Sequence, residues 1–192
     1  MAKCIGIILS TIGTLVVLGA ISGFISYLVF NGRTKHIRYE VFDASFTQFE
    51  LASNNITLQY NLAINASATN PNKKGAYHFE QVMTVAFFGL KNNILSASTF
   101  ERFDLPHNRV AYLASSENQA LRLDLTADEV SKLRSATVFD LLWIASGRSS
   151  TELGRRHAHF NYKAICYLRV PLISDGKFAQ RFNVTMCSVQ KH

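Results

Sequence analysis

Two histidines close together on one predicted strand are the residues whose type and spacing come nearest to a metal site. His157 and His159 alternate with apolar residues in "HAHFNYKAICYLRV", so both imidazoles fall on one face of an extended strand. No third His, Cys or carboxylate accompanies them at a recognisable spacing, and Arg155 and Arg156 would repel a cation. We therefore interpret both histidines as solvated side chains and expect neither a metal site nor a cofactor.

Motifs of the common catalytic sites are missing from the sequence. It contains no Gly-x-Ser-x-Gly, no Walker loop and no paired zinc cysteines. A lumenal domain on a membrane anchor could belong to a glycosyltransferase, but this chain is small and has no Asp-x-Asp for a nucleotide-bound cation. We therefore expect no enzymatic activity and no catalytic residues.

Two of the three cysteines are candidates for a disulfide. Cys166 and Cys187 lie on predicted strands joined by a turn at Asp175-Gly176, and outside the cytosol a disulfide would hold this last hairpin together. Alternation places Cys166 with the apolar residues of its strand and Cys187 with the polar residues of the next. The bond would therefore need a bulge, and two free thiols are the alternative.

Three sequons supply candidate sites for N-linked glycosylation. They are Asn55-Ile-Thr, Asn65-Ala-Ser and Asn183-Val-Thr. In each segment the apolar residues alternate with the acceptor asparagine, so the asparagine faces water. All three could carry a glycan without disturbing a core.

A long uncharged run near the N-terminus indicates a membrane span. Residues 5–30, "IGIILSTIGTLVVLGAISGFISYLVF", contain no charged side chain, and a helix of this length would exceed a hydrocarbon core of about 30 Å. A cleaved signal peptide, the alternative, would have a shorter apolar region and a small-residue cleavage site. We therefore expect an uncleaved signal anchor, with Gly19 and Gly23 forming a GxxxG motif that could mediate self-association.

This span divides the predicted chain into four parts. They are a cytosolic tail (1–4), a transmembrane helix (5–30), a juxtamembrane linker (31–40) and a folded domain (41–192). Cys4, beside the span, is a candidate for palmitoylation, with an unmodified thiol as the alternative. We expect a single-pass plasma-membrane protein whose C-terminal domain lies outside the cytosol.

Period-two alternation dominates the folded domain and predicts an all-β structure. One wet face per strand favours antiparallel pairing, in a β-sandwich of the immunoglobulin or fibronectin type. Thr126 and Glu129 have capping-box spacing and predict one short helix. The predicted strands cover residues 39–51, 55–69, 76–88, 94–103, 110–114, 119–125, 136–145, 157–170 and 179–189.

A distinctive corner separates two of these strands, in "ASATNPNKKGAYHFE". Pro71 fixes its own φ and disfavours the α region for Asn70, and Asn72 tolerates turn geometry. We expect a hairpin here between strands that end near Thr69 and begin near Ala76.

The same residues resemble a known plant family, that of the non-race-specific disease resistance and harpin-induced proteins. "ATNPNKKGAYHFE" is similar to its Asn-Pro-Asn-Lys-Arg, glycine, tyrosine-pair segment, and "ILSASTFERFDLPHN" is similar to its second segment. The C-terminal strands "GRRHAHFNYKAICYLRVPL" and "FNVTMCSV" also resemble the family's last two. The matching motif residues are Asn70, Pro71, Asn72, Lys73, Lys74, Gly75, Tyr77, Phe103, Pro106, His107 and Asn108.

This resemblance implies a late embryogenesis abundant group 2 domain in a membrane protein of plant defence and stress responses, with no catalytic residues. The sequence departs from the family's pattern at three positions, where His78 replaces the second tyrosine of the pair, and Asp104 and Leu105 replace a tyrosine and a glutamine. The usually longer cytosolic tail is also reduced, so signalling through such a tail is not implied here.

Net charge narrows the choice of partner. The chain carries a formal net charge of +7, which favours anionic surfaces such as headgroups or acidic wall polysaccharide. Binding to nucleic acid would require a face that is both basic and aromatic. The sequence localises no such face, so we expect no nucleic-acid partner.

Two functions fit this sequence. The domain could bind protein or cell-wall partners, through a patch of Lys73, Lys74 and the His107 loop. Alternatively, it could bind or transfer lipid in an apolar groove between its sheets. That groove would be lined by residues such as Phe79, Phe87, Phe88 and Trp143.

Overall fold

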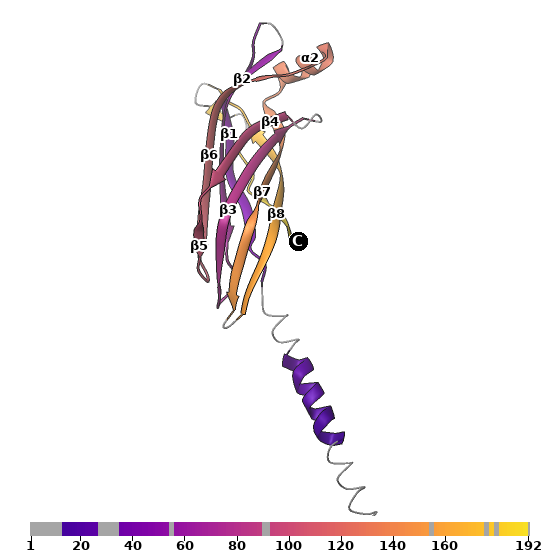
Figure 1. Ribbon diagram of the computed structural model, residues 1–192. Helices are drawn as coiled ribbons and strands as arrows, with labels where there is room; N and C mark the ends of the chain where they lie inside the picture. Colours follow the sequence, from indigo (N-terminus) through magenta and orange to yellow (C-terminus); the bar gives the residue numbers. More distant parts are fainter. Residues whose placement is uncertain are drawn as a thin grey trace, which may run out of the picture. The chain divides into compact units, whose positions relative to one another are not determined.

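The computed structural model describes residues 13–26, 35–53, 56–89, 93–153, 156–174, 177–178 and 181–191 (Figure 1). The chain forms two compact units, Met1–Lys35 and His36–His192. Cys4 and Asn55, two of the predicted modification sites, lie outside the described residues.

The predicted transmembrane helix over residues 5–30 is wrong. Of the predicted span, the structure describes residues 13–26, which are helical, and residues 5–12 and 27–30 lie outside the described part. Within the described part of the chain, no helix has both the length and the apolar character that crossing a bilayer needs.

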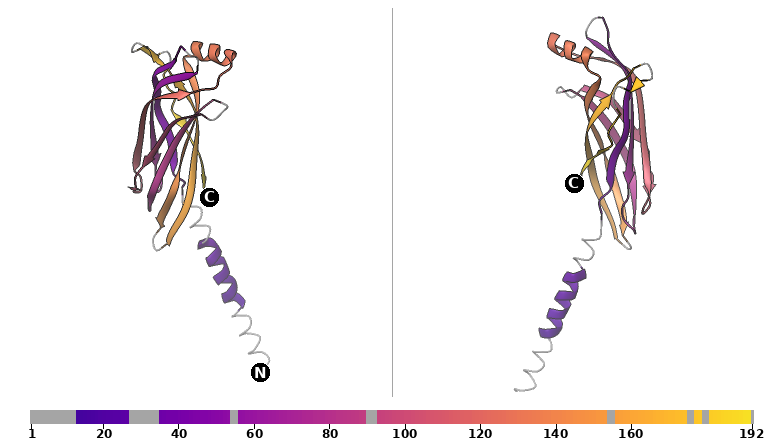
Figure 2. Two further views of the ribbon diagram at one scale, coloured as in Figure 1. Left: turned by 45° about the horizontal axis from the view of Figure 1, so that its top comes forward. Right: turned by 180° about the vertical axis from the view of Figure 1, so that it is seen from behind.

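The second unit has an all-β fold, as predicted. Only the transmembrane helix of the predicted fold class is wrong. One sheet has the strand order β11-β1-β2-β6; the larger has the order β12-β8-β7-β3-β4, with β5 paired to β3. Figure 2 shows both sheets from two further sides. The bounds are β1 Arg38–Leu51, β2 Thr57–Thr69, β3 Ala76–Phe88, β4 Asn93–Phe100, β5 Phe103–Leu105, β6 Val110–Arg122, β7 Val138–Leu153, β8 Arg156–Pro171, β9 Ile173–Ser174, β10 Lys177–Phe178, β11 Thr185–Met186 and β12 Ser188–Lys191.

The two sheets enclose one aromatic core. Tyr39 of β1 stacks on Tyr162 of β8, with ring centroids 5.6 Å apart, and Phe46 of β1 packs edge to face on Phe139 of β7 at 5.3 Å. All four side chains are almost fully buried. Because each pair joins one sheet to the other, burial of these rings holds the two layers together.

Helix α2 (Ala127–Ser135) begins as the capping box predicts. The hydroxyl of Thr126 accepts a hydrogen bond from the backbone N–H of Glu129, and the Glu129 carboxylate accepts one from the N–H of Thr126 at 2.7 Å. None of the helix residues is buried, so α2 contributes little to the core.

Pairing between strands overrides the local pattern at two places. The predicted strands 110–114 and 119–125 form one strand, β6, because the polar residues between them pair with β2 from Asn61 to Ile64. β7 continues beyond its predicted end at 145, because its polar second half lies between β3 and β8 and pairs with both.

The corner between β2 and β3 is not the predicted hairpin. The two strands belong to different sheets, so residues 70–75 carry the chain from one layer of the domain to the other. The turn chemistry of Pro71 and Asn72 is compatible with either arrangement, because it fixes the local backbone and not the partner strand.

The C-terminal segment also changes sheets. β11 pairs with β1 and β12 pairs with β8, so the chain crosses between the layers at Cys187, whose N–H donates to the carbonyl of Tyr39 at 2.9 Å. Cys187 is joined there to Cys166 of β8 by a disulfide, with Cα atoms 4.5 Å apart. The change of sheet brings together two cysteines that alternation places on opposite faces, and it replaces the bulge that we expected.

This disulfide should stabilise the last crossover. It closes a sequence separation of 21 residues, for which chain entropy predicts about 3 kcal/mol. We expect Cys187→Ser to lower the free energy of unfolding in urea by about that amount, and reductant to lower the wild-type midpoint to the same value. A wild-type midpoint that reductant leaves unchanged would contradict the bond. The variant provides the control, because reductant should not affect it.

Candidate functional site: a corner built from two motif segments

The two segments that carry the family resemblance meet in space. β3 pairs with β5, so that Tyr77 lies opposite Leu105. The loops beside these strands are joined by backbone hydrogen bonds from Asn70 N–H to Arg109 O (3.0 Å) and from Asn108 N–H to Asn72 O (3.2 Å). We call residues 70–79 and 103–109 together the motif corner. Sequence reasoning grouped Lys73, Lys74 and the His107 loop in one patch, but it did not predict that β3 pairs with β5.

The side chain of Asn70 holds this corner together. It is fully buried, and its amide nitrogen lies 3.1 Å from the carbonyl oxygens of Gly75 and Leu105 and 3.2 Å from that of Pro106. The two N–H groups of one amide are thus shared among three carbonyls from both segments. The reverse orientation would place the Asn70 oxygen against the same three acceptors, so this pattern fixes the orientation of the amide.

Asn72 completes the buried polar network. The Oδ1 atom of Asn70 accepts hydrogen bonds from the backbone and side-chain nitrogens of Asn72, each at 3.0 Å. The same side-chain nitrogen lies 3.4 Å from the hydroxyl of Tyr77. Burial raises the pKa of Tyr77, an effect that the hydrogen bond from Asn72 partly offsets, so this phenol stays protonated and neutral.

Two residues of the corner adopt left-handed backbone conformations. Gly75 has φ +91° and Asn108 has φ +52°. Glycine has no Cβ, and asparagine tolerates this region better than most residues, which explains their presence at the two turns.

Two departures from the family pattern contact each other. His78 and Asp104 are register partners on β3 and β5, and His78 Nδ1 lies 2.8 Å from Asp104 Oδ1. Glu152 of β7 lies on the other side, 3.8 Å from His78 Nε2. A polar pair therefore occupies the positions where the family pattern has tyrosines. Either change alone would leave one polar group without this partner.

The outer surface of the corner is cationic. Lys73 and Lys74 from the first segment, and His107 and Arg109 from the second, are all exposed. The predicted patch of Lys73, Lys74 and the His107 loop thus lies on two loops joined by backbone hydrogen bonds, and Arg109 is an exposed cation there that sequence reasoning missed. Arg109 directly follows the motif residue Asn108, and this position in the sequence could have identified it as part of the patch.

The other predicted site residues are dispersed. Asn65 lies half-buried on β2, and Asn183 is exposed. His159 Nδ1 approaches Glu80 at 4.0 Å, whereas the side chain of His157 lies outside the described part. No group of three metal-ligating side chains occurs among the described residues.

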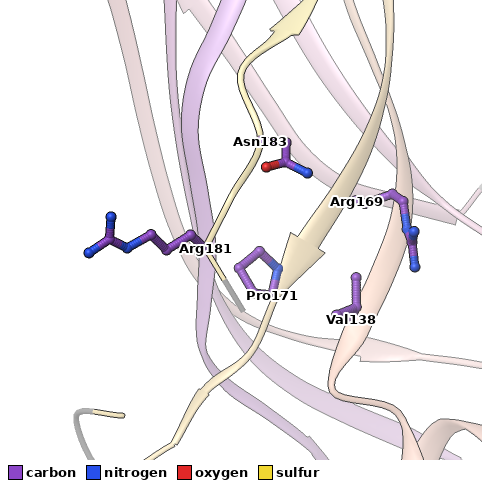
Figure 3. Close-up of a pocket in the computed structure, with 5 residues that line it drawn as sticks. All are labelled: Val138, Arg169, Pro171, Arg181 and Asn183. Atoms are coloured by element: carbon purple, nitrogen blue, oxygen red, sulfur yellow. The ribbon is translucent and has the colours of Figure 1, made fainter. Parts of the chain in front are cut away.

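Figure 3 shows a small surface pocket beside Asn183. Its volume is about 20 Å³, room for roughly one water molecule, and the guanidinium group of Arg181 points away from the other lining residues. The pocket is lined by Val138, Arg169, Pro171, Arg181 and Asn183. It is too small for a lipid chain.

Residues expected to line a lipid groove pack otherwise. Phe79 and Trp143 are buried, and Phe79 stacks on Phe103 with centroids 4.6 Å apart. Phe87 lies on the outer face of its sheet, in a row with Leu142 and the exposed Tyr167. The face that we expected to be wet is therefore partly apolar. The sequence of β8 already indicated this, because alternation places Tyr167 on the same face as the polar residues of that strand.

The fold and the motif corner together define the structural class of this protein. It is an all-β domain in which the two motif segments meet at one end of the sheets. No family model matches the chain. It is 28% identical over 199 residues to NDR1/HIN1-like protein 3 of Arabidopsis thaliana, covering 96% of this chain and 80% of the relative. It is 31% identical over 75 residues to NDR1/HIN1-like protein 10 of Arabidopsis thaliana, covering 39% of this chain and 32% of that protein.

A solved solution structure, described as that of a late embryogenesis abundant (LEA) protein, matches with a TM-score of 0.29 and 10% identity. The match covers 89% of this chain and 78% of the other. At this TM-score we infer neither fold nor function from it.

The chain is therefore similar to NDR1/HIN1-like proteins, and the family resemblance predicted from its motifs is confirmed. This homology supports a plant protein of defence and stress responses. Proteins of this family are generally not enzymes.

Replacing Asn70 should destabilise the domain strongly. Asn70→Ala removes two donors and one acceptor and leaves buried carbonyls without partners, so we expect a loss of about 3 kcal/mol or more in the free energy of unfolding. Urea denaturation measures it, and Asn118→Ala, at an exposed position of β6, should change stability by less than about 0.5 kcal/mol. Equal stabilities of the two variants would show that the network contributes little.

Proposed function

We propose that this protein is a non-enzymatic interaction module of plant defence and stress responses, whose motif corner binds an anionic partner. The carrying observation is that a buried amide network fixes two loops that present Lys73, Lys74, His107 and Arg109 on one surface. Acidic wall polysaccharide or an acidic protein surface has the matching charge.

Preorganisation supports this function. Asn70 and Asn72 tie both loops to the sheets, so binding would cost little ordering of the backbone. The net charge of +7 would add attraction at longer range and speed encounter with an anionic surface.

We further propose that the domain lies outside the cytosol. A disulfide between Cys166 and Cys187 persists most readily in an oxidising compartment, and the sequons at Asn65 and Asn183 require passage through the secretory pathway to be used.

Lipid binding between the sheets is less well supported. The core positions that would line such a groove are filled by stacked rings, among them Phe79 on Phe103 and Phe46 on Phe139. An acyl chain would have to displace them, at a cost similar to that of opening a core cavity.

Charge reversal at the corner tests the function. We expect Lys73→Glu with Lys74→Glu to weaken binding of the full-length protein to polygalacturonate by about tenfold, or about 1.4 kcal/mol. Binding by biolayer interferometry at rising salt should show the wild type losing affinity more steeply than the variant.

Arg122→Glu with Lys132→Glu is the matched control, because it makes the same change in net charge. Arg122 lies twelve residues along β6 from Val110, about 40 Å from the corner at about 3.4 Å per residue. Equal weakening by both double variants would show that only net charge matters and would refute a site at the corner.

A further inference from the structure

An exposed pair of aromatic rings covers one strand on the outer face of the smaller sheet. Phe42 of β1 and Tyr112 of β6 pack edge to face with centroids 5.8 Å apart. The strand order β1-β2-β6 places β2 between them, so the two rings meet above β2. Both remain accessible, Phe42 at 39% and Tyr112 at 73%. We call this pair the aromatic roof.

A register shift in β1 lies beside the aromatic roof. It occurs between Val41 and Asp43, and Phe42 and Asp43 are consecutive exposed residues there, in contrast to the strict alternation around them. Phe42 faces outward by alternation with the buried Val41, and the shift turns Asp43 outward beside it.

The roof explains an anomaly on β2. Ser67 lies between the inward-facing Ala66 and Ala68 and should therefore face solvent, yet it is only 1% exposed. Ser67 is the register partner of Tyr112, and its hydroxyl donates to Glu40 Oε1 at 3.1 Å. The rings above it exclude water from an outward-facing polar residue.

Asn65 is the next outward-facing residue of β2, at the edge of the roof. Its partner on β6 is Ala114, whose small side chain leaves the space above the strand open, and its amide nitrogen donates to Asp43 Oδ2 at 3.2 Å. Asn65, Ala66 and Ser67 form a sequon. An acceptor asparagine thus lies directly beside two accessible aromatic rings.

We propose that Asn65 carries an N-linked glycan and that the roof of Phe42 and Tyr112 holds its first N-acetylglucosamine. In the transfer, Asn65 Nδ2 bonds to C1 of the sugar of a polyprenyl-diphosphate-linked oligosaccharide. The bond from C1 to the diphosphate oxygen breaks, and the diphosphate leaves as the amide loses one proton. The occupant is a pyranose whose C–H face can pack on the rings while its hydroxyls stay hydrated.

The hydrogen bond to Asp43 is compatible with this modification. A primary amide has two N–H groups, and glycosylation replaces only one of them. The other can still donate to Asp43 Oδ2, which would fix the direction in which the glycan leaves the sheet.

The buried Ser67 sets the order of events. The transferase must read the Ser67 hydroxyl, which the folded sheet hides beneath the roof. Transfer therefore precedes the closure of β2 between β1 and β6, and the folded protein is not a substrate.

A coupling experiment on the full-length protein from plant cells tests this inference. Peptide mass spectrometry should find a glycan on Asn65, and Asn65→Gln should lower the melting temperature by about 3 °C. In a Tyr112→Ala background the same substitution should change the melting temperature by less than about 1 °C, because the sugar has lost its ring.

Tyr167→Ala is the matched control, since Tyr167 is an equally exposed tyrosine (78%) on the other sheet. The effect of Asn65→Gln should persist undiminished in that background. An unmodified Asn65 would overturn the proposal, and so would an equal effect of Asn65→Gln in the Tyr112→Ala and Tyr167→Ala backgrounds.

Discussion

The hydrogen bonds of one buried amide, that of Asn70, are the interaction on which the arrangement of this domain most depends. A two-layer β-structure must carry its chain from one sheet to the other, and each crossing exposes backbone groups that no strand pairs. At the crossing from β2 to β3, Asn70 donates to Gly75, Leu105 and Pro106 and accepts from Asn72. It therefore satisfies the backbone at the crossing and joins it to the segment around β5.

The C-terminal crossing solves the same problem differently. There the chain passes between the sheets at Cys187, where a backbone hydrogen bond to Tyr39 and the disulfide to Cys166 secure it. Two crossings are thus closed by two kinds of chemistry, a polar network and a covalent bond. The core between them is packed with rings such as Tyr39 on Tyr162.

Surface features follow from these closures. The cations at the motif corner are held by a network with few degrees of freedom, and the aromatic roof lies beside a register shift that turns Asp43 outward next to Phe42. In each case a fixed backbone places side chains that are separated in sequence.

The sequence by itself determined the all-β character, the start of helix α2 at Thr126 and the family resemblance, because alternation, capping and short motifs are encoded within a few residues. It did not determine which strand pairs with which. Only the tertiary structure made the 70–75 corner a crossing between sheets, merged two predicted strands into β6, and brought Asn70 to Leu105, 35 residues away. Strand pairing and the burial of polar groups depend on contacts between distant residues, and no local pattern in the chain specifies them.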